Sequence, residues 1–138
     1  MPFELTIVTP QGQAYSGPAD SVVLPGSEGD FGVLPGHERF LTPLRVGAVE
    51  IRVGSELLWA AIADGFADVN GDAVALLVES CELASEIDSA RAEHARERAE
   101  QGLRELERNE QAARHAQFEQ ALARARVRLE VSQKKRGG

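Results

Sequence analysis

The sequence has little cysteine, few aromatic residues and no long hydrophobic run, and each shortage excludes a class of protein. One cysteine among 138 residues rules out an intramolecular disulfide and suits a reducing compartment. The longest apolar run, from Leu57 to Ala63, is far shorter than the roughly 20 residues that a membrane span needs. Any association with a membrane is therefore expected to go through a partner.

Basic residues are also too few for a dedicated nucleic-acid binder, since the formal net charge is −7. The first ten residues lack the basic, apolar and cleavage regions of a signal peptide, so we expect no secretion signal. The three histidines and the lone cysteine have no metal-ligand spacing, and we expect no metal site. The chain is too short for a complete dinucleotide-binding fold or a barrel enzyme.

The composition changes sharply near Cys81. All six prolines lie within residues 1–43, and ten of the 13 glycines lie within residues 1–81. Residues 1–81 carry 11 acidic and 3 basic side chains, whereas residues 82–138 carry 11 and 12. We therefore expect two domains, over residues 1–84 and 85–138.

The first part has the pattern of β-strands. Apolar and polar residues alternate from Phe3 to Ile7, which is typical of a half-buried strand. Further β-rich runs follow, separated by glycines, over residues 22–24, 48–53, 57–62 and 74–78. The Asn70-Gly71 pair predicts a two-residue hairpin turn. Closely spaced turn signals without an intervening helix indicate an antiparallel β-sandwich or barrel.

The second part predicts two helices. We expect the first to begin at Ile87-Asp88, with Asp88 or Ser85 as its N-cap, and to end at Arg108-Asn109. Small and apolar residues spaced three and four apart form a heptad seam: Ala92, Ala95, Ala99, Gly102 and Leu106, then Phe118, Leu122, Ala125 and Leu129. A short connection makes this an antiparallel helical hairpin, and the whole chain α+β.

An alanine seam buries little apolar area, because each alanine in place of leucine gives up roughly 2 kcal/mol of burial. The hairpin is therefore expected to be held weakly. Two interpretations stay open, a movable two-state element and an ordinary static hairpin.

Arginines are predicted to gather where the second helix returns to the start of the first. Arg124 and Arg128, four residues apart, are expected near Arg91 and Arg98 and near the acidic Glu82. Four such cations repel one another unless acids or a polyanion lie between them. A network of ion pairs and an anionic ligand both remain open as explanations.

Three segments together resemble a known family. Residues 24–37, LPGSEGDFGVLPGH, are similar to the signature segment of the epsilon subunit of the rotary proton-translocating ATP synthase. Residues 63–71, ADGFADVNG, resemble its late hairpin, and residues 87–92, IDSARA, match the motif that opens its first C-terminal helix. The resemblance runs along essentially the whole chain.

The resemblance implies a non-catalytic subunit of the central stalk. Its N-terminal sandwich would touch the gamma subunit and the membrane ring of c subunits. Its hairpin would fold against the sandwich or extend toward the alpha and beta subunits, where it inhibits ATP hydrolysis. It would lie peripherally, on the cytoplasmic face of a bacterial plasma membrane or the stromal face of thylakoids.

The resemblance also implies site residues. No cofactor is required, but ATP is implied as a regulatory ligand of the compact hairpin, at Glu82, Ile87, Asp88, Arg91, Ala92, Arg98, Arg124 and Arg128. The contacts to the c ring and gamma would include Glu28, Asp30, Phe31, Gly32 and His37. Two alternatives outside the family are a free-standing adaptor and a small hydrolase that uses His37 and Asp30.

Overall fold

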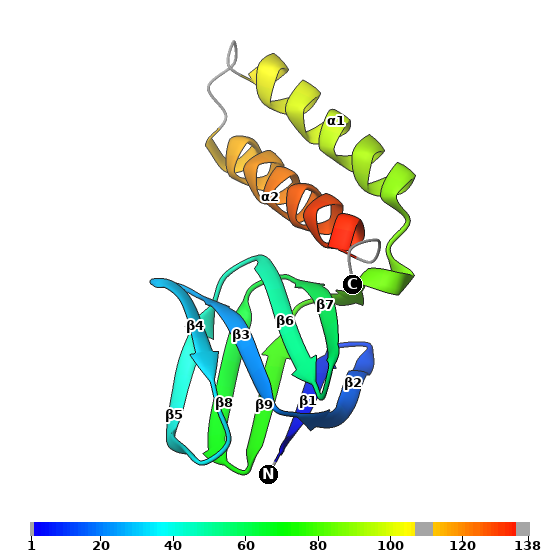
Figure 1. Cartoon of the computed structure of the whole chain (residues 1–138). Coiled ribbons are helices and arrows are strands. Elements are labelled where there is room, and N and C mark those ends of the chain that lie inside the picture. Colours follow the sequence, from blue (N-terminus) through cyan, green and yellow to red (C-terminus); the bar gives the residue numbers. More distant parts are fainter. Residues whose placement is uncertain (1, 107–111, 135–138) are drawn as a thin grey trace.

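The computed structural model describes residues 2–106 and 112–134, and it contains a β-sandwich followed by two helices (Figure 1). The strands are β1 (Phe3–Thr9), β2 (Gly12–Ala19), β3 (Ser21–Gly26), β4 (Gly29–Val33), β5 (His37–Leu44), β6 (Gly47–Val53), β7 (Glu56–Ile62), β8 (Gly65–Gly71), β9 (Ala73–Val78) and β10 (Cys81–Leu83). A short 3-10 helix, η1 (Ala84–Glu86), leads to α1 (Ser89–Leu106) and α2 (Ala112–Lys134). The predicted α+β fold, with the sandwich first and the hairpin second, is confirmed.

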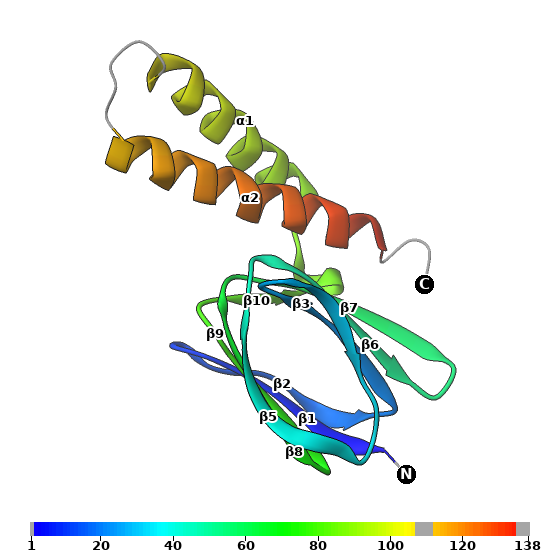
Figure 2. The ribbon, with the colours of Figure 1, turned by 90° about the vertical axis from the view of Figure 1, so that its left-hand side faces the viewer.

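The strands form one sheet in the order β10-β7-β6-β3-β5-β8-β9-β1-β2, with β4 paired to β3 alone. The sheet folds over on itself into two layers, as Figure 2 shows. It turns the corner where β3 pairs with β5 at Gly26 and Leu44 only. Alternating side chains of both layers fill one core, and Leu5, Leu24 and Leu76 are fully buried in it.

One strand pair departs from the antiparallel pattern of the predicted sandwich. β1 runs parallel to β9, with Leu5 opposite Val74. Short hairpin connections require antiparallel neighbours, but β1 and β9 are distant in the sequence and no such connection constrains them. The long-range pairing therefore depends on the tertiary fold.

Two local predictions are refined by the register. Asn70 pairs with Ala73, so the residues that form the β8–β9 turn are Gly71 and Asp72, one position later than expected. Gly71 has φ 57°, which suits a glycine. Residues 29–33, for which the sequence predicted no strand, form the regular strand β4 against β3.

The helices are antiparallel neighbours, and their predicted seam is confirmed. Figures 1 and 2 both show α1 and α2 side by side. Ala92, Ala99 and Gly102 are buried between them on α1, as are Leu122 and Ala125 on α2. The expected break at residues 108–109 lies outside the described residues.

The first helix begins at Ser89, two residues after the predicted start, and Asp88 is its N-cap. Its Oδ1 accepts hydrogen bonds from the backbone N–H groups of Ala90 at 3.0 Å and Arg91 at 3.2 Å. These bonds satisfy two of the amide groups that a helix leaves unpaired at its first turn. Of the two candidates for the cap, the structure selects Asp88.

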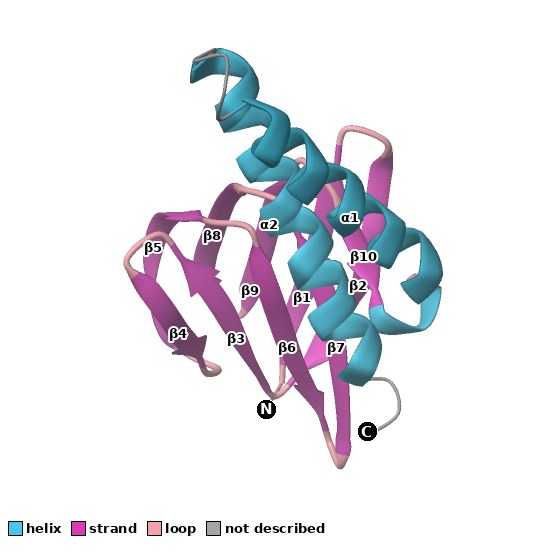
Figure 3. Cartoon of the chain, turned by 90° about the horizontal axis from the view of Figure 1, so that it is seen from above, coloured by secondary structure: helices cyan, strands magenta, loops and turns pink. Residues whose placement is uncertain are grey.

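The hairpin rests on the sandwich through the C-terminal half of α2, seen from above in Figure 3. α2 lies against β6, β7 and η1. Val131 of α2 is fully buried in a small cluster with Ala61, Ala84 and Ile87, and Trp59 packs at its margin. We call this cluster, together with Ala48 and Val127 that also pack against it, the docking interface.

Candidate functional site

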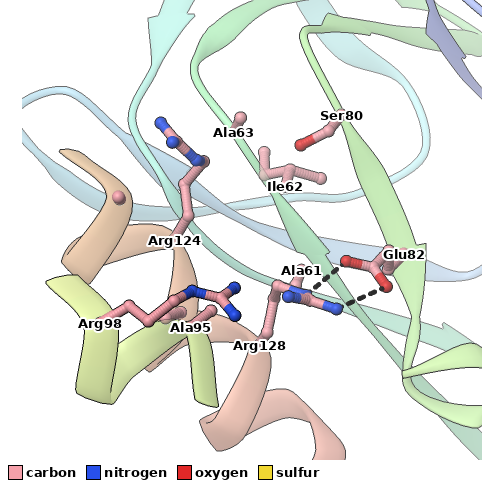
Figure 4. Close-up of a pocket in the computed structure, with 11 residues that line it drawn as sticks. Ala61, Ile62, Ala63, Ser80, Glu82, Ala95, Arg98, Arg124 and Arg128 are labelled. Carbon is pink, nitrogen blue, oxygen red and sulfur yellow. Dashed lines mark hydrogen bonds and ion pairs between the residues drawn. The ribbon is translucent and has the colours of Figure 1, made fainter. Parts of the chain in front are cut away.

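A pocket of about 370 Å³ opens where both helices meet the sandwich (Figure 4). Its lining comes from three parts of the fold: Ala61, Ile62, Ala63, Ser80 and Glu82 of the sandwich, Ala95 and Arg98 of α1, and Ala121, Arg124, Ala125 and Arg128 of α2. A volume of this size falls in the range of small-molecule sites. Because all three parts contribute to it, the pocket exists only while the hairpin is docked.

Four of the eight residues that the resemblance assigns to ATP line this pocket. They are Glu82, Arg98, Arg124 and Arg128. The predicted gathering of four arginines is therefore reduced to three, because Arg91 is exposed and does not line the pocket.

The other assigned residues have structural positions nearby. Asp88 caps α1, as described above. Ile87 is 2% exposed in the docking interface, and Ala92 is fully buried in the helical seam. Their roles in binding ATP remain predictions.

An ion pair crosses the pocket between the sandwich and α2. The Arg128 Nε lies 2.6 Å from Glu82 Oε1, and the Arg128 Nη2 donates to Glu82 Oε2 at 3.4 Å. In contrast, Arg98 and Arg124 form no ion pair with any described residue. The expected network of ion pairs is therefore limited here to one pair.

The pocket residues fit an anionic ligand. Three guanidinium groups and one carboxylate give the lining a formal charge of +2, on a chain whose net charge is −7. Guanidinium groups bind phosphate oxygens in a bidentate manner. Alanine and isoleucine side chains supply the apolar remainder of the wall. A nucleotide combines both requirements, and its phosphates would be held by the arginines.

The glycine-rich residues 26–32 lie in the hairpin of β3 and β4, and Glu28 is exposed at its turn. Asp30 forms an ion pair with Arg45 at 2.5 Å. The ring of Phe31 packs 5.9 Å from that of Phe40, centroid to centroid. Gly32 pairs with Val23 along the hairpin. An acidic turn on a braced hairpin is a suitable surface for contact with another protein.

His37 begins β5, and its ring lies 5.2 Å from that of Phe40. Its Nδ1 is 3.4 Å from the backbone oxygen of Glu38. Within the described parts of the chain, no hydrogen bond links His37 to Asp30. The structure therefore gives no support to a hydrolase built on these two residues.

An apolar surface on the outer face of β5, β8 and β9 was not predicted from the sequence. Leu41, Phe66 and Leu77 are 67%, 52% and 51% exposed. Phe66 pairs with Pro43 on one side and Leu77 on the other, so Pro43, Phe66 and Leu77 form a row across three strands. Leu41 is two residues from Pro43 along β5, on the same face of the sheet, and pairs with Asp68. Contiguous exposed apolar side chains mark interaction surfaces. The available signal was in β9, where apolar residues occupy both odd and even positions and so place apolar side chains on both faces of the sheet.

The docking interface was also missed. The Lys134 Nζ lies 4.9 Å from the ring centroid of Trp59, within range of a cation–π interaction. Val127 and Val131 are four residues apart on a face of α2 distinct from the seam, and this second apolar stripe was the available signal.

Cys81 lies in β10, opposite Ile62 of β7. Burial, together with the nearby Glu86 and Glu82 carboxylates, raises the pKa of the Cys81 thiol to about 11. A thiol that stays protonated is a poor nucleophile, so Cys81 is better suited to packing than to covalent chemistry. Among the described residues, no helix is both long and apolar enough to span a membrane.

Comparison with known proteins supports the resemblance. The family descriptions "ATP synthase, Delta/Epsilon chain, beta-sandwich domain" and "ATP synthase, Delta/Epsilon chain, long alpha-helix domain" match residues 2–84 and 85–133. The ATP synthase epsilon chain of Syntrophobacter fumaroxidans is 45% identical over 132 residues, covering 96% of each chain. That of Halalkalibacterium halodurans is 40% identical over 94% of this chain and 96% of its own.

A solved structure agrees with these relatives. A chain in the Euglena gracilis mitochondrial ATP synthase, in a structure of OSCP, F1 and the c-ring, superimposes with a TM-score of 0.79 at 26% identity. The match covers 96% of the present chain and 81% of that chain. The protein therefore belongs to the ATP synthase delta/epsilon family.

Proposed function

We propose that this chain is the epsilon-type subunit that couples the rotating catalytic head of a proton-translocating ATP synthase to its membrane ring. We further propose that the helical hairpin is a movable brake on ATP hydrolysis and that the pocket senses ATP. The subunit performs no catalysis itself. It lies peripherally, on the cytoplasmic face of a bacterial plasma membrane or the stromal face of thylakoids.

The observation that carries this proposal is the small docking interface. α2 is held on the sandwich by a few apolar side chains, chiefly Val131 and Ile87, and by the contacts of Arg128 and Lys134. Three of the remaining apolar members are alanines, which bury little area. Such an interface is weak enough for the hairpin to leave the sandwich as a unit.

Two surfaces of the sandwich support the coupling role. The apolar surface that includes Leu41, Phe66 and Leu77 is suited to a permanent partner, and we assign it to the gamma subunit. The β3–β4 hairpin, with Glu28 at its turn, is assigned to the c ring, where opposed charges set the register of the contact. The sandwich then transmits torque as a rigid body.

The hairpin would act through a two-state equilibrium. In the compact state it rests on the sandwich and leaves rotation free. In the extended state it lies between gamma and the alpha and beta subunits and arrests hydrolysis. A ligand that binds the compact state alone stabilises it by RT ln(1 + [L]/Kd), about 2.7 kcal/mol at a hundredfold excess over Kd.

Locking the compact state tests the brake. Ala48→Cys and Val127→Cys, joined by a short bis-maleimide in a Cys81→Ser background, would bridge β6 and α2 across the docking interface. In the assembled enzyme the locked subunit should raise ATP hydrolysis to the rate of a complex whose subunit ends before α1. Equal rates in locked and unlocked complexes, both below the truncated one, would show that the hairpin is not the brake.

A thermal shift of the isolated chain tests ATP sensing. The double variant Arg98→Ala with Arg124→Ala should lose the rise in melting temperature that ATP causes in the parent chain. Arg126→Ala is the matched control, since Arg126 is exposed on the same helix and does not line the pocket. Absence of any shift in the parent chain would refute ATP sensing and leave the coupling role intact.

A further inference from the structure

The lining of the pocket is positively charged although the protein as a whole is acidic, and one carboxylate lies among the arginines of the lining. Among the described residues that line the pocket, Glu82 is the only acidic one, against three arginines. Figure 4 shows its side chain pointing from the sandwich toward Arg128 of α2. Without Glu82 the formal charge of the lining would rise from +2 to +3.

The Glu82–Arg128 pair also joins the two parts of the fold. The other ion pairs among the described residues lie within the sandwich, as Arg45–Asp30 does, or within the hairpin. Of the ion pairs in the described part of the chain, only Glu82–Arg128 joins the sandwich to the hairpin. It therefore contributes to docking when no ligand is bound.

The pair engages the edge of Arg128 that would bind a phosphate. Glu82 lies against both Nε and Nη2, but only Nη2 donates a hydrogen bond to it; the buried Nε is 2.6 Å from Oε1 and has no hydrogen-bond partner among the described residues. A phosphate that binds this edge would offer a hydrogen bond to both nitrogens. Within residues 2–106 and 112–134, Arg98 and Arg124 have no ion-pair partner. An incoming anion finds two arginines available and the third already engaged.

We propose that Glu82 is a built-in competitor of the anionic ligand: it holds Arg128 in the ligand-free compact state and thereby weakens binding. The inference rests on the proposed ATP-sensing role of the pocket. The ligand takes Arg128 from Glu82, so that phosphate replaces the carboxylate. This effect on ligand affinity is the opposite of the one that the family resemblance implies, in which Glu82 would be a favourable contact to the ligand.

The proposal predicts the direction of a single substitution. Glu82→Gln keeps the size of the side chain and removes its charge, which frees Arg128 and removes the repulsion between carboxylate and phosphate. The pair is only partly exposed, so we expect ATP to bind about three- to tenfold more tightly. The same substitution weakens docking in the absence of ligand.

The weaker docking must be separated from the change in affinity, because a smaller compact population lowers apparent affinity. The bis-maleimide bridge between Ala48→Cys and Val127→Cys keeps the compact state populated. Ala48 and Val127 line a different cavity from the one that Arg124 and Arg128 line. Affinity measured in this locked chain reports on the pocket alone.

The experiment is calorimetry of ATP and of inorganic triphosphate with locked parent, Glu82→Gln and Glu79→Gln chains. Glu79→Gln is the matched control, since Glu79 is exposed, does not line the pocket and gives the same change in net charge. Circular dichroism checks that each chain is folded. A gain for Glu82→Gln with both ligands and none for Glu79→Gln is the expected result.

The unlocked chains supply the second readout. Acrylamide quenching of Trp59, the single tryptophan, should increase in ligand-free Glu82→Gln and stay at the parent value in Glu79→Gln. Quenching unchanged by Glu82→Gln would contradict the contribution of the pair to docking.

Failure of the competitor role is distinguishable from failure of ATP sensing. If ATP binds the parent chain and binds Glu82→Gln equally or more weakly, Glu82 is not a competitor, and ATP sensing stands. If neither chain binds ATP or triphosphate, both ideas are overturned. Binding by Glu82→Gln alone would mean that the competitor fully closes the site.

Discussion

Replacing Val131 by alanine should release the hairpin from the sandwich without unfolding either part. Val131 is fully buried in the docking interface and becomes exposed when α2 leaves. The substitution removes two methyl groups, which at about 0.8 kcal/mol each weakens docking by about 1.6 kcal/mol. That corresponds to a roughly fifteenfold loss in the docking equilibrium constant. Any remaining cavity adds to this loss.

Trp59 is the natural reporter, because it packs at the margin of the docking interface, beneath Lys134. Acrylamide should quench its fluorescence more in Val131→Ala than in the parent chain. Gln133→Ala is the matched control, since Gln133 is exposed on the same helix and its replacement also introduces alanine. Identical quenching in all three chains would refute the reasoning that this cluster holds the hairpin.

Three further predictions concern single positions. A Cβ on Gly102 would lie within 2.6 Å of three Phe118 ring carbons. Gly102→Ala should therefore lower the melting temperature of the hairpin, measured by circular dichroism, and the additional substitution Phe118→Leu should restore part of the loss. Asp88→Ala removes the N-cap and should cost about 1 kcal/mol of helix stability, whereas Asp88→Asn should retain most of that stability, both measured by urea unfolding. Equal losses of stability in the two variants would argue against capping. Because the folded state raises the pKa of Cys81 from 9.0 to about 11, the unfolded chain loses this proton first. Stability from this group should therefore be intact below pH 9 and fall between about pH 9 and 11, and pH-dependent melting of Cys81→Ser should lack this component.

Local patterns were enough to predict most elements of the fold. Period-two alternation identified β1, and the three- and four-residue spacing from Ala92 to Leu106 identified the seam of α1. Strands whose composition is unfavourable were missed, because tertiary pairing overrides propensity. β5 contains Pro43 and three exposed charged or histidine residues at its start, yet it pairs along β8.

The candidate site was predictable only in part, for a geometric reason. The i,i+4 spacing places Arg124 and Arg128 on one face of α2 whatever surrounds the helix. The presence of Arg98 beside them, and the absence of Arg91, depends on how the two helices are rotated about their axes. That rotation is set by packing, in which Phe118 lies against Gly102.

The sequence by itself determined both helices, most of the strands and where charges of each sign are concentrated, because these follow from neighbours within a few residues of one another. Only the tertiary structure decided that β1 runs parallel to β9, that Val131 is the centre of docking and that Glu82 faces Arg128. These features join residues far apart in the chain. Their geometry is set by the packing of whole elements, and no local pattern encodes it.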